Sequence, residues 1–159
     1  MEFEVSAELV GIYLEDAREH LALLDAALLR LEREGHDPEI AASLLGPLHT
    51  LKGNSGMIGF AGVKDYVHRL EEVFARARDG ALVLDAGALD GLLQGATALR
   101  HAVEASCAAG REACDLAQEQ AAILPLIGSS FASPYRPEPA SSTDTTATGN
   151  GAAADDATL

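Results

Sequence analysis

His49, Lys52, Gly53 and Gly56 are the residues whose types and spacing are best suited to chemistry. The last three follow His49 by three, four and seven positions, so on a helix all four share one face. A neutral imidazole presents a nucleophilic nitrogen at neutral pH. Lys52 offers a positive charge to the oxygens of a phosphoryl group. The pattern predicts an exposed docking face around a reactive histidine.

Gly53 and Gly56 destabilise a helix, because each lowers helix stability by about 1 kcal/mol relative to alanine. Glycine removes the side chain and lets another surface approach closely. We therefore interpret both as partner-docking positions. The residues alone leave a second interpretation open: the glycines only let helices cross closely, and His49 is an ordinary surface histidine.

Hydrophobic periodicity predicts the elements that must position this face. Apolar residues recur at steps of three and four in five segments, which is typical of amphipathic helices. Short connections between such helices favour antiparallel neighbours. The predicted fold is an all-α, antiparallel up-down helical bundle with a four-helix core and a fifth C-terminal helix. The predicted helices are 6–34, 38–57, 62–79, one beginning after Asp85 and one beginning after Gly110.

The fifth segment and the cysteines carry two further predictions. Its buried stripe is expected to be Cys114, Ala117, Ala121 and Leu124. Cys107 and Cys114 are too few for a disulfide framework, and we interpret both as small buried residues in a reducing compartment. The remaining histidines are interpreted as surface residues: His20, His36 and His101.

Composition divides the chain into two parts. With 48% hydrophobic residues among 159, the sequence is rich enough in apolar side chains for a core, which we place in residues 1–127. Residues 128–159 are mostly Ser, Thr, Ala, Gly, Pro and Asp, and such a stretch buries too little surface to offset its ordering entropy. We expect a disordered tail or interdomain linker there.

The net charge and the absence of known sequence motifs exclude several classes of function. A net charge of −14 disfavours nucleic acid as a partner, because the phosphate backbone is repelled. No apolar stretch reaches the roughly 20 residues of a membrane span, and the acidic N-terminus is not typical of a signal peptide. A cytoplasmic location without membrane contact is expected. No glycine-rich nucleotide-binding pattern is present, so no cofactor and no ATP are expected on this chain.

The segment 48–60, LHTLKGNSGMIGF, together with HRLE at 68–71, resembles histidine phosphotransfer (HPt) domains. It is most similar to the N-terminal phosphotransfer domain of CheA-type chemotaxis histidine kinases, and the resemblance spans about residues 5–127. The length of the C-terminal tail and the match to CheA-type features favour a fragment or an N-terminal domain of such a kinase. The kinase domain is then expected either downstream in the same protein or in another chain.

The resemblance also implies a role for each residue. His49 is expected to carry the phosphoryl group on Nε2, with Lys52 beside it and Gly53 leaving room for a partner. Glu71 is expected to accept a hydrogen bond from His49 Nδ1–H, which fixes the tautomer that can attack through Nε2. His68 is expected to face the same helix as Glu71.

The implied function is that of a phosphorelay carrier. It accepts a phosphoryl group from a histidine kinase domain and passes it to an aspartate of a response-regulator receiver, with ATP and Mg²⁺ bound only by partner domains. Two other classes remain open: a non-catalytic helical interaction module, and a metal-dependent helical enzyme. The second would use His49, His68 and Glu71 as zinc ligands, although Lys52 on the same face disfavours a cation.

Overall fold

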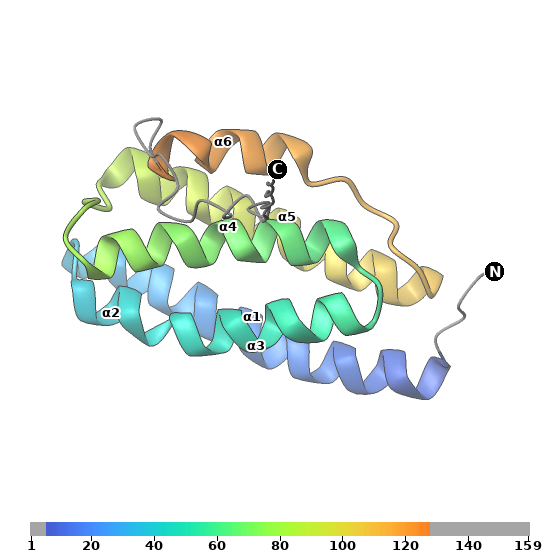
Figure 1. The fold of residues 1–159 in the computed structure, drawn as a ribbon. Coiled ribbons are helices and arrows are strands. Elements are labelled where there is room, and N and C mark those ends of the chain that lie inside the picture. The colour runs from blue at the N-terminus through green and yellow to red at the C-terminus, as the bar shows by residue number, and fades with distance from the viewer. Residues whose placement is uncertain (1–5, 128–159) are drawn as a thin grey trace, which may run out of the picture. The chain divides into compact units, whose positions relative to one another are not determined.

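The computed structural model describes residues 6–127, and these form six α-helices without a strand. Helix α3 packs on α4, α1 packs on α5, and α6 packs on both α4 and α5. Figure 1 shows α1, α3, α4 and α5 as neighbouring rods, with α6 lying over α4 and α5 on the side away from α1 and α3. The all-α bundle with an added C-terminal helix is confirmed. The helices are α1 (Ala7–Glu34), α2 (Pro38–Ser43), α3 (Leu45–Met57), α4 (Ala61–Arg78), α5 (Ala86–Ala109) and α6 (Ala117–Ile127).

Helix starts follow local sequence signals. The Ser6 hydroxyl accepts a hydrogen bond from the backbone N–H of Leu9 at 3.1 Å, which caps α1. Asp37 caps α2 in the same manner, and Pro38 occupies its first turn. Asp85 caps α5. Each side chain satisfies a backbone donor that a helix start leaves free, so these boundaries were readable from the sequence.

The predicted helix 38–57 is wrong in one respect, because the structure breaks it at Leu44 into α2 and α3. Pro47 explains the break. It has no N–H to donate to the carbonyl of Ser43 one turn earlier, and its ring crowds that carbonyl. Helix α3 therefore begins only one turn before His49.

The predicted stripe of the last helix is also wrong. Cys114, Ala117, Ala121 and Leu124 are exposed, and Cys114 lies in the connection before α6. The buried residues are Leu116, Ile123 and Ile127, while Cys107 in α5 is buried as expected. The larger aliphatic side chains set the orientation of α6, because each buries far more apolar area than alanine does.

Tyr66 of α4 packs in the core against α5. It is fully buried, and it packs so closely on Gly95 of α5 that a β-carbon there would overlap its hydroxyl oxygen. Within residues 6–127 this hydroxyl has no hydrogen-bond partner, and burial raises the pKa of Tyr66 above its usual value. No helix in this range is both long enough and apolar enough to cross a membrane.

Helix α4 begins without a capping side chain of its own, since Phe60 stands at the N-cap position. The connection between α5 and α6 supplies one instead. Oε2 of Glu112 accepts a hydrogen bond from the backbone N–H of Val63 at 2.9 Å. Gly62 leaves the space, because a β-carbon there would lie 2.7 Å from the same oxygen. A residue far along the chain thus holds the start of the helix that carries Glu71.

We expect Glu112→Ala to lower the free energy of unfolding by about 1 kcal/mol, because α4 loses its cap and a charge that favours a helix N-terminus. Chemical denaturation followed by circular dichroism measures the loss. Glu32→Ala, at an exposed glutamate of α1, is the matched control and should leave stability unchanged. Equal stabilities for the two variants would show that the Glu112 contact contributes nothing.

Candidate functional site

His49 lies on the outer face of α3. Its side chain is 72% exposed, whereas Leu48, Leu51 and Ser55 on the opposite face are buried. The buried face is anchored by a hydrogen bond of 2.8 Å between the hydroxyls of Ser55 and Tyr13. Helix α3 is therefore held in place through its buried face and exposes the imidazole to solvent.

Glu71 of α4 meets the imidazole from the side. Its Oε2 lies 3.2 Å from His49 Nδ1, and its side chain is only 16% exposed. The contact favours the tautomer that carries its proton on Nδ1, and this tautomer has its lone pair on Nε2. A carboxylate so placed also stabilises positive charge that develops on the ring when Nε2 attacks an electrophile.

Lys52 shares the same carboxylate. Its Nζ forms an ion pair with Glu71 Oε1 at 2.8 Å. The Lys52 side chain is 22% exposed, so the pair is largely sheltered. The Lys52 ammonium group is thus held within one helical turn of His49, where it can contact an anionic group attached to the imidazole.

A hollow of about 520 Å³ opens beside these residues, between α3 and α4. His68 lies at its rim and is exposed. Within the described part of the chain, no hydrogen bond or ion pair joins His68 to His49. The lining residues are Leu45, Gly46, His49 and Lys52 from α3 and His68, Glu71, Glu72 and Ala75 from α4.

The two glycines after His49 have different surroundings. A β-carbon at Gly53 would meet nothing within 4 Å, so this position borders open space. A β-carbon at Gly56 would lie 3.1 Å from Cδ of Lys64 on α4. A side chain at Gly56 would have to displace the exposed side chain of Lys64, whereas one at Gly53 would meet no internal neighbour.

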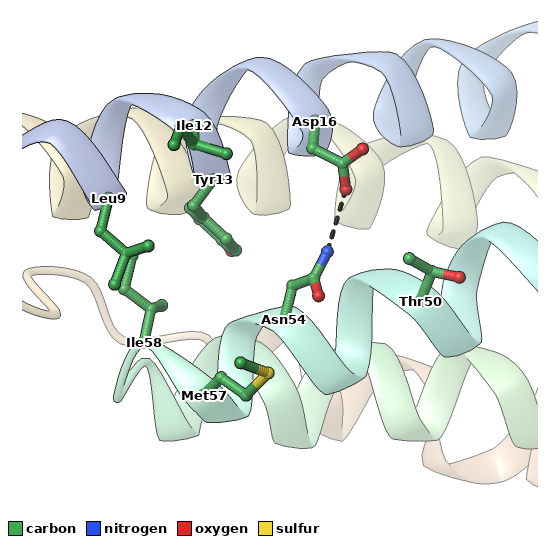
Figure 2. Close-up of a pocket in the computed structure, with 8 residues that line it drawn as sticks. All are labelled: Leu9, Ile12, Tyr13, Asp16, Thr50, Asn54, Met57 and Ile58. Carbon is green, nitrogen blue, oxygen red and sulfur yellow. Dashed lines mark hydrogen bonds between the residues drawn. The ribbon is translucent and has the colours of Figure 1, made fainter.

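Sequence reasoning missed a second hollow, an apolar groove of about 410 Å³ between α1 and α3 (Figure 2). Met57 is 87% exposed and Ile12 60% exposed along it. A hydrogen bond of 2.9 Å from the amide of Asn54 to Asp16 crosses it. Thr50, the residue after His49, lines one end of the groove. The remaining lining residues are Leu9, Tyr13 and Ile58.

The groove wall includes Tyr13, whose pKa is raised to about 12 because burial penalises the phenolate. Tyr13 also packs edge-on against Phe60, with ring centroids 5.4 Å apart. The available sequence signal for the groove was the pair Leu9 and Ile12, which fall outside the buried stripe of the first helix.

Two of the other histidines are not simple surface residues. Nδ1 of His36 accepts a hydrogen bond from the backbone N–H of Leu84 at 3.1 Å, which joins two connections at one end of the bundle. His20 is half-buried, with Nδ1 3.2 Å from Asp16. His101 is exposed as predicted. The described residues contain no group of three or more His, Cys, Asp or Glu side chains placed to hold a metal ion.

Residues 8–109 match the Hpt domain family, and this chain belongs to that family. It is similar to the chemotaxis protein CheA of Listeria monocytogenes, with 26% identity over 123 residues, covering 77% of this chain and 20% of the relative. The CheA of Halobacterium salinarum is 31% identical over 83 residues, covering 52% of this chain and 12% of the relative. The chain thus spans a fifth or less of the length of these relatives.

A solved structure gives the same relationship. The phosphorylated P1 domain of CheA3 from R. sphaeroides, crystallised in complex with CheY6, superposes with a TM-score of 0.67 at 25% identity. The match covers 76% of this chain and 94% of that domain. The bundle is therefore an Hpt fold of the kind found in CheA P1 domains.

We expect Glu71→Gln to slow phosphorylation of His49 and to redistribute its proton between the two ring nitrogens. The amide keeps the shape of the carboxylate but lacks the charge that holds Nδ1–H. Nitrogen-15 NMR of the ring reports the tautomer directly, and labelling with a kinase domain reports the rate. Glu19→Gln, at an exposed glutamate of α1, is the control. An unchanged tautomer and rate in Glu71→Gln would mean that the contact does not orient the ring.

Proposed function

We propose that this chain is a phosphorelay carrier in chemotaxis-type two-component signalling. It accepts a phosphoryl group on Nε2 of His49 from a histidine kinase domain, and it passes the group to an aspartate of a response-regulator receiver. The observation that carries this proposal is the exposed imidazole whose Nδ1 lies 3.2 Å from the sheltered carboxylate of Glu71. Membership of the Hpt family supports it.

The proposed reaction requires little of the carrier beyond positioning. The Nε2 lone pair attacks the γ-phosphorus of ATP held by the kinase domain, the Nε2–P bond forms, and the bond to the leaving oxygen of ADP breaks. The ring keeps its Nδ1 proton and donates it in a hydrogen bond to Glu71, whose carboxylate stabilises the positive ring. Lys52 turns towards the transferred oxygens. In the second step an aspartate oxygen attacks the same phosphorus and the Nε2–P bond breaks.

Partners of two kinds follow from this scheme. The kinase supplies ATP and Mg²⁺, and the receiver supplies the acceptor carboxylate, so this chain needs no cofactor of its own. The CheA relatives and the CheA3–CheY6 complex support a CheA-type kinase and a CheY-type receiver as partners. We place this exchange in the cytoplasm. The net charge of −14 supports protein partners over nucleic acid.

One incubation tests the proposal against the non-catalytic interaction module. The full chain is mixed with a CheA-type kinase domain, labelled ATP and Mg²⁺, and a receiver domain is added afterwards. We expect label on the chain that survives alkali and is lost in acid, as a phosphoramidate bond to histidine behaves, and that moves to the receiver. A chain that binds the kinase domain but never acquires label would favour the interaction module.

A further inference from the structure

Most glycines of the described helices and turns have a structural cause. Four adopt positive φ, where side chains are disfavoured: Gly35, Gly59, Gly80 and Gly110. Three more face an atom that a β-carbon would crowd: Gly56, Gly62 and Gly95. At four further helical glycines nothing lies within 4 Å of a β-carbon: Gly11, Gly46, Gly53 and Gly91.

Two of these four stand on either side of the phosphoacceptor. Gly46 precedes His49 by three residues and Gly53 follows it by four, so each lies one helical turn away on the same face. Both are exposed. Gly46 also lines the hollow that contains His49, Lys52 and Glu71. A side chain at Gly46 would therefore project beside the imidazole into space that the bundle itself leaves open.

We propose that Gly46 is an access position for the phosphotransfer partners, kept free of a side chain so that their active sites can reach His49 over the α3/α4 hollow. This inference rests on the proposed function. Gly46 takes no part in the bond changes at His49. Its role is to leave space for the partner's active site. The cost of about 1 kcal/mol for glycine in a helix is then offset by faster transfer and not by packing.

The geometry of phosphoryl transfer requires that such a position affect both steps. When Nε2 attacks ATP, the leaving oxygen of ADP lies beyond the phosphorus, on the line extended from Nε2. When the receiver takes the group, its aspartate oxygen enters along that same line while the Nε2–P bond breaks. Both partners therefore approach the same side of the imidazole, and a side chain that obstructs one also obstructs the other.

Pro47 offers a competing explanation for Gly46. The residue before a proline is disfavoured in helical conformation, partly because its β-carbon clashes with the proline ring, and glycine relieves that clash. On this explanation a larger residue at 46 would strain the start of α3 and move His49. The two explanations separate when Pro47 is replaced as well.

The test uses the full chain, a CheA-type kinase domain with ATP and Mg²⁺, and a receiver domain. Gly46→Leu is compared with Gly46→Ala and with Gly91→Leu, the same change at an open position of α5. Phosphoramidate serves as a third donor, because it needs no protein surface: its N–P bond breaks and ammonia leaves as the Nε2–P bond forms. Gly46→Leu/Pro47→Ala is compared with Pro47→Ala alone.

We expect Gly46→Leu to slow both protein-mediated steps about tenfold or more, as displacement of a reacting partner by about 1 Å does. Labelling by phosphoramidate should stay at the wild-type rate, Gly46→Ala should slow both protein-mediated steps less than Gly46→Leu does, and Gly91→Leu should transfer normally. The slowing should persist in the Pro47→Ala background.

Three results would overturn the inference while the proposed function stands. They are wild-type transfer by Gly46→Leu, an equal slowing with phosphoramidate, and recovery of transfer when Pro47 is also replaced. If the wild-type chain takes no phosphoryl group from the kinase domain, the proposed function is wrong and the inference fails with it.

Discussion

His49→Gln is expected to abolish phosphoryl labelling while leaving the helical circular dichroism and the thermal midpoint close to those of the wild type. Glutamine has no nucleophilic ring nitrogen, so the Nε2–P bond cannot form. The fold should tolerate the change because the His49 side chain is 72% exposed and contributes little to packing. The measurement is incorporation of labelled phosphate from ATP through a kinase domain.

His101→Gln is the matched control, since it removes an exposed imidazole on α5 without touching the candidate site. It should label at the wild-type rate. Full labelling of His49→Gln would instead place the acceptor elsewhere, and His68 at the rim of the hollow would be the next residue to replace.

Gly95→Ala is expected to give the largest loss of stability among single-carbon changes, about 1–3 kcal/mol or more, because the new β-carbon would overlap the Tyr66 hydroxyl. Tyr66→Phe should be neutral or stabilising, since it removes a buried hydroxyl that has no partner within residues 6–127. In the double variant the nearest ring atom is Cζ, 3.1 Å from the β-carbon. The loss from Gly95→Ala should therefore shrink markedly.

A double-mutant cycle by chemical denaturation measures this coupling. Gly91→Ala is the control on the same helix, and it should stabilise by up to about 1 kcal/mol because its β-carbon enters open space. Additive effects of Gly95→Ala and Tyr66→Phe would show that the two residues do not compete for the same volume.

Local signals in the sequence predicted most of the helices. Caps such as Ser6 and Asp85 and the apolar stripes of α4 and α5 depend on residues within a few positions of one another, so periodicity is enough to find them. Pro47 is an equally local signal for a helix break. The predicted helix 38–57 did not take it into account and therefore combined α2 with α3. The Ala-rich α6 has a weak stripe of its own, and its orientation is set by Ile123 and Ile127 packing on the bundle.

The candidate site was predicted less completely than the fold. His49, Lys52 and Glu71 were expected together from the resemblance to phosphotransfer domains, and the structure brings them within ion-pair distance. Gly46 lies three residues before His49, so helical spacing alone could have placed it on the same face as Gly53, but the open space beside it is visible only in the structure. The Glu112 contact was hidden for a similar reason, since it joins residues 49 positions apart. The prediction for residues 128–159 lies outside the described residues.

The Glu112 contact also bears on how shortened versions of this domain should be cut. The match to the family ends at residue 109, which makes the C-terminus of α5 an inviting boundary for expression or for fusion to another protein. A chain cut there would lose the carboxylate that caps α4, and α4 carries Glu71. Such a truncation would destabilise the N-terminus of α4, and through it the position of Glu71 beside His49. A minimal phosphoacceptor domain should therefore extend beyond Glu112, whether or not it includes α6.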